Sequence, residues 1–206
     1  ANAQAMKATS PSDGTEWEQD ATLYSKRSAG GHRAYVTERS AYVPNHGNPL
    51  RAGRAGVGAQ ISLYPATVTV EAGHGFDLNR KAYALASADY RLTGRLKLKA
   101  DAAYNSANTP VKALNQNVYA HEYNLAAEYR HSSVTQIGAG VGLMDFDDGN
   151  LRKSANVWMN NLLYQHDRWQ LGSKLWADYS ANKNIPEARF AAARRYIYYI
   201  YVFFLI

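Results

Sequence analysis

RLTGRLKLKADAAYN, residues 91–105, alternates apolar and polar side chains along most of its length. Successive side chains of a β-strand point to opposite faces, so Leu96 and Leu98 share one face while Lys97 and Lys99 share the other. A soluble sheet would turn the leucines toward a core, whereas a membrane barrel would turn them toward lipid and the lysines toward a water-filled lumen. The rest of the sequence has to decide between these two arrangements.

The same alternation recurs along the chain and predicts further strands. Its clearest examples lie in residues 17–23, 54–63, 66–72, 84–90, 122–129, 136–143 and 169–179. Residues 32–42 alternate poorly, and residues 155–164 predict a strand whose facing stays open. The 16 tyrosines also favour strands over helices. No apolar run reaches the roughly 20 residues of a membrane-spanning helix, so any membrane span in this sequence has to be a strand of a closed barrel.

The connections between these segments alternate in length. Short turns are predicted near residues 28–31, 64–65, 91–95, 130–133 and 165–168, and longer polar segments at 44–51, 74–81, 105–120, 145–153 and 180–189. Outer-membrane barrels combine short periplasmic turns with long outer loops in this way. Several apolar faces also end in aromatic residues, as barrel girdles do: Tyr64, Tyr90, Tyr104, Tyr129, Trp169 and Tyr179. Together these features favour a membrane barrel over a soluble β-domain.

We therefore predict an all-β fold, an antiparallel transmembrane β-barrel of the bacterial outer membrane. Residues 1–206 contain about ten or eleven predicted strands, and the segment before residue 15 is expected outside the membrane. A bacterial barrel chain begins and ends in the periplasm, so at least one strand is expected before residue 1 and further strands after residue 206. The sequence thus predicts one partial barrel domain.

Alternation also predicts which charged residues line the lumen. The predicted acidic lining residues are Glu18, Asp20, Glu71, Asp89, Asp101, Glu122, Glu128 and Asp178, and the basic ones are Arg54, Lys97, Lys99 and Lys174. Most other basic residues of this chain, whose formal net charge is +6, fall in turns and loops. A net-acidic wall favours a cationic passenger. The scattered basic pairs do not form the patch of a nucleic-acid-binding module, so no nucleic-acid partner is predicted.

No set of residues predicts catalysis, a metal site or a cofactor. The six histidines fall in or beside connections without metal-ligand spacing, and no serine has the sequence context of a nucleophile. Residues 145–150, DFDDGN, match a calcium loop poorly, because Gly149 and Asn150 occupy its fifth and sixth positions. A tight turn is predicted there instead. The absence of cysteine excludes disulfides and thiol chemistry.

Three segments resemble the barrel domain of the bacterial poly-β-1,6-N-acetyl-D-glucosamine export porin family. They are RAGRAGVGAQISLYPATVTVEAGHG (51–75), YALASADYRLTGRLKLKADAAYNSANTPVKALNQNVYAHEYNLAAEYR (83–130) and GVGLMDFDDGNLRKS (140–154). The most specific part is the outer loop NTPVKALNQNVYA (108–120) between two strands, followed in order by FDDGN (146–150). The resemblance covers roughly residues 15–190.

The resemblance implies a single-chain, sixteen-stranded barrel in outer-membrane lipid. Periplasmic helical repeats, absent from this segment, precede that barrel and guide the polymer from a periplasmic polysaccharide deacetylase. The implied passenger is a partly deacetylated poly-N-acetylglucosamine exopolysaccharide used in biofilm formation, and its ammonium groups suit an acidic lumen. Trp176, if it faces that lumen, is expected to stack on a sugar ring or to pack against its barrel neighbours. A general or substrate-selective diffusion porin, or an adhesive barrel, is the alternative.

The end of the sequence departs from this family. Residues 188–206 read ARFAAARRYIYYIYVFFLI, where the family has an asparagine-proline turn and an alternating strand. A strand that is apolar on both faces does not suit a water-filled lumen. The register of residues 191–206 therefore stays open.

Overall fold

The computed structural model describes residues 2–10, 14–43, 48–166, 169–183 and 193–204. This part of the chain contains twelve strands and one short helix, α1 (Val111–Leu114). The strands are β1 (Asn2–Ser10), β2 (Gly14–Tyr24), β3 (Arg33–Val43), β4 (Leu50–Leu63), β5 (Ala66–Asp77), β6 (Ala82–Arg91), β7 (Leu96–Tyr104), β8 (Ala120–Arg130), β9 (Thr135–Phe146), β10 (Leu151–His166), β11 (Trp169–Asn182) and β12 (Ala193–Phe204). No helix in this part is long and apolar enough to cross a membrane.

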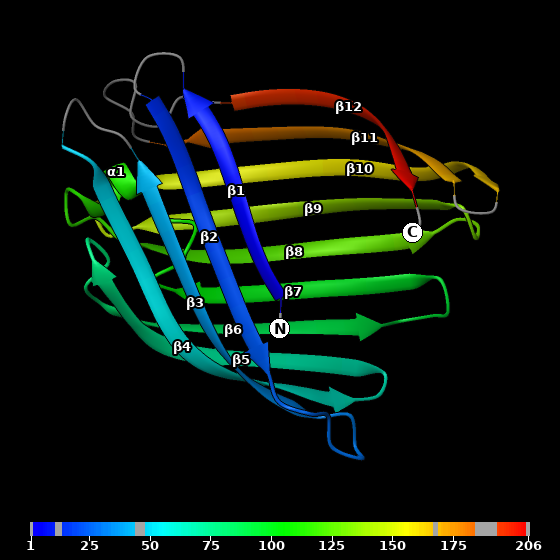
Figure 1. The fold of residues 1–206 in the computed structure, drawn as a ribbon, viewed down its shortest axis with the longest axis horizontal. Coiled ribbons are helices and arrows are strands. Elements are labelled where there is room, and N and C mark those ends of the chain that lie inside the picture. Colours follow the sequence, from blue (N-terminus) through cyan, green and yellow to red (C-terminus); the bar gives the residue numbers. More distant parts are fainter. Residues whose placement is uncertain (1, 11–13, 44–47, 167–168, 184–192, 205–206) are drawn as a thin grey trace. The chain divides into compact units, whose positions relative to one another are not determined.

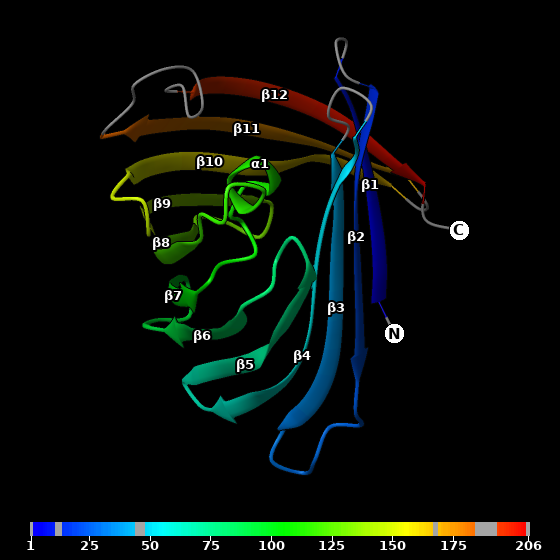
Figure 2. The ribbon, with the colours of Figure 1, turned by 90° about the vertical axis from the view of Figure 1, so that its left-hand side faces the viewer.

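The strands pair in the order in which they follow one another along the chain (Figure 1). They belong to two compact units, which we describe separately. The first unit contains residues 1–88, 101–122 and 146–148, and the second contains residues 89–100, 123–145 and 149–206. In the first unit β1 to β5 form successive antiparallel pairs (Figure 2). In the second unit β9 to β12 do the same, so the predicted all-β antiparallel fold is confirmed.

β1 lies in a segment that the sequence predicts to be outside the membrane. Its residues pair with β2 over the whole strand, from Asn2 opposite Thr22 to Ser10 opposite Gly14. The sequence did not predict this strand, because NAQAMKATS is rich in small side chains and shows no apolar face, while main-chain hydrogen bonds require no particular side chain. β1 also raises the number of strands to twelve, above the predicted ten or eleven.

β12 is a strand in the segment whose register the sequence leaves open. It pairs with β11 in an antiparallel register that runs from Trp169 opposite Phe204 to Ser180 opposite Ala193. The predicted loop at 180–189 and the predicted turn at 165–168 lie partly outside the described residues. The same holds for the predicted loop at 44–51.

The connections follow the predicted alternation of lengths only in part. Residues 92–95 form a short connection and residues 105–119 a long one, as predicted. Residues 78–81 and 147–150 are short, however, because β5, β9 and β10 continue into segments predicted as loops. Polar side chains do not end a strand whose main-chain groups still have partners. Gly149 has a φ of +84°, a backbone conformation that residues with a Cβ atom rarely adopt and that is common in turns. The predicted tight turn is therefore confirmed.

The long connection, residues 105–119, is folded around α1. Leu114 of α1 and Tyr119 are buried against Ala52 of β4. The Asp147 carboxylate accepts a hydrogen bond from the main-chain nitrogen of Tyr119 at 2.9 Å. This apolar cluster and its hydrogen bonds fix the connection to the first unit, a feature that its loop-like sequence did not predict.

Candidate functional site on the polar face

Large apolar side chains on these strands are exposed, whereas many charged ones are half-buried. Leu98 on β7 is 39% exposed and Leu125 on β8 is 61% exposed. Lys97, Lys99 and Glu128, at alternate positions of the same strands, are half-buried. Soluble proteins preferentially bury large apolar side chains, so this arrangement is inverted. We call the side of each strand with the exposed apolar residues the apolar face, and the opposite side the polar face.

Most of the residues predicted to line a lumen are half-buried members of the polar face. The strand registers place Asp20 opposite Arg39 and Asp178 opposite Asn156. Glu18 is exposed. The half-buried members are Asp20, Arg54, Glu71, Asp89, Lys97, Lys99, Asp101, Glu122, Glu128, Lys174, Trp176 and Asp178. They belong to small clusters, which we describe within each unit.

Glu128 is the centre of an ion-pair cluster in the second unit. Its two carboxylate oxygens lie 3.1 Å from the Lys97 ammonium and 2.5 Å from the Lys99 ammonium. The Lys97 ammonium also lies 3.9 Å from the Asp89 carboxylate. The Glu128 side chain is 15% exposed, against 36% and 37% for the two lysines. Two cations therefore compensate the charge of this carboxylate directly.

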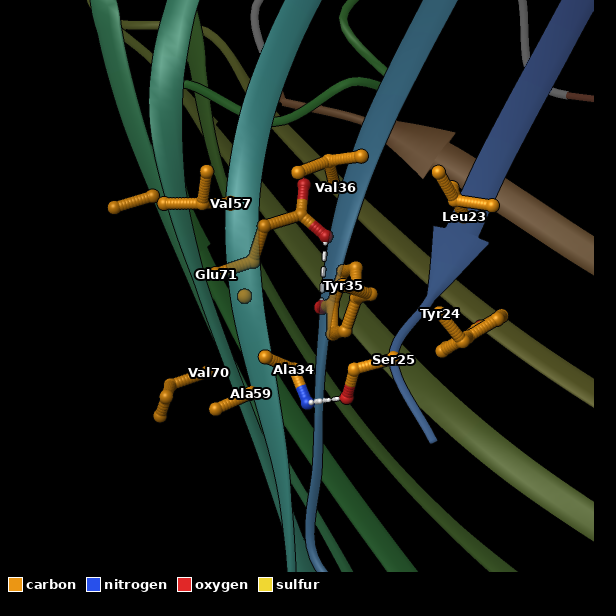
Figure 3. Close-up of a pocket in the computed structure, with 12 residues that line it drawn as sticks. Leu23, Tyr24, Ser25, Ala34, Tyr35, Val36, Val57, Ala59, Val70 and Glu71 are labelled. Atoms are coloured by element: carbon orange, nitrogen blue, oxygen red, sulfur yellow. Dashed lines mark hydrogen bonds between the residues drawn. The ribbon is translucent and has the colours of Figure 1, made fainter. Parts of the chain in front are cut away.

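Glu71 is the centre of a different cluster in the first unit. The hydroxyls of Tyr35 on β3 and Tyr83 on β6 each donate a hydrogen bond of 2.9 Å to its carboxylate. Figure 3 shows the bond between the Tyr35 hydroxyl and the Glu71 carboxylate. The Arg54 guanidinium lies 4.3 Å from the centre of the Tyr83 ring. The immediate partners of Glu71 are thus neutral hydroxyls.

Glycines on the polar face make room for these aromatic rings. Gly58 lies directly opposite Tyr35 in the β3–β4 register, and a Cβ atom at Gly58 would be 2.3 Å from the Tyr35 ring. A Cβ atom at Gly56 would be 2.0 Å from the Tyr83 hydroxyl. The rings therefore lie over positions without side chains, which sets the Tyr35 and Tyr83 hydroxyls beside Glu71.

The polar face of β3 carries two arginines that alternation did not place there. Arg39 forms a 2.7 Å ion pair with Asp20, and Arg33 lies at an alternate position of the same strand. The prediction missed them because Glu38 and Ser40, which contact each other, occupy the apolar face at positions opposite Ala55 and Gly53. Polar residues on both faces remove the period of two that reveals facing.

β10 adds two further polar-face residues, because its register now assigns the facing that the sequence left open. Arg152 lies opposite Asn182 and donates to its side-chain oxygen at 3.2 Å. Trp158 lies opposite Trp176. With Arg33, Arg39 and Arg152 included, the acidic excess of the polar face is smaller than the sequence predicted.

Glu122 and a recess in the second unit are two further features of the polar face. Glu122 accepts hydrogen bonds of 2.8 and 3.1 Å from the Asn108 amide and also contacts the Ser106 hydroxyl, so it holds the start of the long connection. In the second unit, a recess of about 210 Å³ lies near the 92–95 connection, and four of its nine lining residues are cationic. Its charged residues are Arg91, Arg95, Lys97, Glu128 and Arg130.

The described residues contain no group of three histidine or acidic side chains placed to hold a metal ion. The arrangement is instead an array of fixed charges, hydroxyls and aromatic rings along one face of the strands. Such an array can attract, orient and release a polar molecule that moves past it.

Comparisons with known proteins place the chain in a family. Residues 1–200 match the PgaA membrane beta barrel domain. The chain belongs to this family. Its exposed apolar face and half-buried polar face suit a membrane β-barrel, and its place is the bacterial outer membrane.

A solved structure described as a bacterial polysaccharide outer membrane secretin is similar in fold. The TM-score is 0.75 at 14% sequence identity, and the match covers 89% of this chain and 62% of that chain. This chain therefore spans less than two thirds of the length of that structure. No significant match is found among curated proteins.

Proposed function

We propose that this chain forms part of the wall of a conduit that exports a polysaccharide through the outer membrane. In this proposal the apolar face contacts lipid and the polar face lines the water-filled path. The family membership and the inversion of exposure between the two faces support it. We infer transport rather than catalysis from the family membership and from the fixed charges and aromatic rings that the described residues place on the polar face.

The polymer in this proposal is a partly deacetylated poly-N-acetylglucosamine, released into biofilms after a periplasmic deacetylase has acted on it. The observation that carries the proposal is that half-buried carboxylates recur on the polar face and already have partners, as Glu71 and Glu128 do. A carboxylate that already has partners attracts a passing ammonium group without holding it tightly. Many weak attractions favour movement, whereas one tight site would stop the polymer.

Amide substitutions on the polar face test this proposal in the complete barrel protein. Asp89→Asn, Asp101→Asn, Glu128→Gln and Asp178→Asn combined are expected to lower export of the deacetylated polymer and to shift the ion selectivity of the channel away from cations. Glu122 is left intact because it holds the long connection. The control is Asp77→Asn with Asp148→Asn, which removes two exposed carboxylates at or in connections.

Two outcomes would decide against the proposal. Unchanged ion selectivity in the folded quadruple variant would remove these carboxylates from the conducting path. Changed ion selectivity with unchanged polymer export would indicate a general diffusion porin. Passage of a neutral oligosaccharide is expected to stay nearly unchanged in the variant, since it carries no ammonium group.

A further inference from the structure

Two tryptophans lie opposite each other on the polar face of the second unit. Trp158 on β10 and Trp176 on β11 are direct partners in the strand register, and both are half-buried. Their neighbours Val157 and Leu175 are 56% and 49% exposed, which places the tryptophans on the opposite face. Neither residue belongs to the ion-pair cluster around Glu128.

The Trp158 ring lies over a glycine on the next strand. Gly138 on β9 is the register partner of Trp158, and a Cβ atom there would be only 2.3 Å from the indole ring. Gly140 and Gly142 continue this glycine stripe along β9 on the same face. One side of the indole is therefore seated on backbone at Gly138, which leaves its other side as the platform.

The two neighbours of Trp158 on the polar face of β10 are uncharged, whereas those of Trp176 on β11 are Lys174 and Asp178. Asn156 and Asn160 flank Trp158 on the polar face of β10, and the Asn156 oxygen would be 3.1 Å from a Cβ atom at Gly140. Gln136 lies opposite Asn160. Side-chain amides carry both donors and acceptors, as hydroxyl and acetamido groups of a sugar require.

A lysine ammonium group already lies near the Trp176 ring. The Lys174 ammonium lies 5.7 Å from the centre of this ring, within the range of a cation–π contact. Asp178 lies on the other side of Trp176 along β11, opposite Arg195 in the β11–β12 register, and its Oδ1 atom is buried without a hydrogen-bond partner among the described residues. An ammonium group that approached this ring on the Lys174 side would therefore meet repulsion from Lys174.

We propose that Trp158 and Trp176 form a stacking subsite that takes uncharged, N-acetylated sugar residues of the polymer. This inference rests on the proposed function. The C–H groups on one side of a pyranose ring pack against an indole, whose face carries partial negative charge. The asparagines hydrogen-bond the hydroxyl and acetamido groups, and Lys174 disfavours residues that carry a free ammonium group. The carboxylates of the polar face and this subsite thus engage different residues of a partly deacetylated polymer.

Single-channel recordings of the complete barrel in planar bilayers test the subsite. The probes are a β-1,6-linked N-acetylglucosamine oligosaccharide and its fully deacetylated counterpart, each measured by how long it blocks the ion current. Trp158→Ala with Trp176→Ala is expected to shorten blockades by the acetylated probe about tenfold, while Trp158→Phe with Trp176→Phe shortens them less than threefold. Blockades by the deacetylated probe are expected to change less than twofold in both.

A matched control comes from the adjacent register pair. Met159 and Leu175 are partners on the same two strands but lie on the apolar face, so Met159→Ala with Leu175→Ala is expected to leave both probes unaffected. Lys174→Gln is expected to lengthen blockades by the deacetylated probe severalfold and to leave the acetylated probe nearly unchanged. A heat-dependent shift in gel mobility checks that each variant barrel is folded.

The outcomes separate this subsite from the proposed function. Unchanged blockade by the acetylated probe in the folded double-alanine variant overturns the subsite, and so does equal loss for both probes. If the quadruple amide variant still loses polymer export, the proposed function stands without the subsite. A native barrel that neither probe blocks overturns both.

Discussion

Glu71 in the first unit and Glu128 in the second unit are both half-buried carboxylates of the polar face, yet their partners differ in kind. Two tyrosine hydroxyls bond to Glu71, whereas two lysine ammonium groups bond to Glu128. Hydroxyls hold a carboxylate in place without cancelling its charge. Ammonium groups cancel the charge, and the lysine side chains that carry them are more than one third exposed, which weakens the attraction through solvent screening.

This difference shows that the number of acidic and basic residues on a face does not determine the electric field along that face. Hydrogen bonds from neutral donors contribute mainly to stability, while ion pairs contribute mainly to the distribution of charge. Removing the partners of Glu71 should therefore cost more stability than removing those of Glu128, and the reverse order should hold for ion selectivity. The following predictions test this comparison in the complete barrel, in order of decreasing effect on stability.

Removing the two hydroxyls that bond to Glu71 is expected to have the largest effect. Tyr35→Phe with Tyr83→Phe leaves a half-buried carboxylate without these two donors, and hydrogen bonds to charged groups contribute about 1.5–3 kcal/mol each when buried. We expect the free energy of unfolding in lipid vesicles, measured by urea titration, to fall by about 2–4 kcal/mol. Tyr123→Phe is the control, because Tyr123 is 51% exposed on the apolar face. A loss no larger than in this control would contradict the prediction.

Adding one carbon at Gly58 is expected to have an intermediate effect. The new Cβ atom would be 2.3 Å from the Tyr35 ring, so the ring must move and strain its bond to Glu71. Overpacking of this kind costs about 1–3 kcal/mol. Gly58→Ala should lower the free energy of unfolding by about that amount, and Gly94→Ala, where no atom lies within 4 Å, should not.

A double-mutant cycle sharpens this second prediction. If Gly58→Ala acts by displacing the Tyr35 hydroxyl, its cost should be smaller in a Tyr35→Phe background, because that hydrogen bond is already lost. Additive costs would show that the strain at Gly58 lies elsewhere.

The polar face could be predicted from the sequence where one face of a strand is uniformly apolar. On β7 the alternation of Leu98 with Lys97 and Lys99 assigned both faces, and the exposure of these residues agrees with it. On β3 the same reasoning failed, because Glu38 and Ser40 lie on the apolar face and Arg39 was not recognised as the partner of Asp20. When both faces of a strand carry polar residues, the sequence no longer shows to which face each side chain belongs.

Partners are harder to predict than facing, since they depend on the register between strands. The sequence assigned Glu71 and Glu128 to one face, but Tyr35 is far from Glu71 in the chain and meets it across β4. The tryptophan pair has the same origin, because Trp158 opposes Trp176 only in the β10–β11 register. A run of glycines at alternate positions, such as Gly138 to Gly142, is the one signal in the sequence that could have suggested rings packed beside it.

Replacing the cations around Glu128 is expected to change stability least and selectivity most. Lys97→Gln with Lys99→Gln removes two ion pairs, each worth at most about 1 kcal/mol because the lysines are solvated. Glutamine can still donate a hydrogen bond to Glu128, so the free energy of unfolding should fall by less than in either variant above. The charge of Glu128 then becomes uncompensated, and the reversal potential in a salt gradient should shift toward cation selectivity.

Salt and a charge-matched control decide whether this shift arises on the polar face. Fixed charges are screened over about 10 Å at 0.1 M salt and about 3 Å at 1 M, so the shift should shrink as salt is raised. Lys26→Gln with Lys112→Gln removes the same charge from an exposed connection and from α1, and should shift the reversal potential much less. Tyr35→Phe with Tyr83→Phe changes no charge and should leave selectivity unchanged. The tyrosine variant could instead shift the reversal potential as far as the lysine variant does. That result would show that neutral partners affect ion selectivity as strongly as ionic partners do, and it would contradict the proposed difference between Glu71 and Glu128.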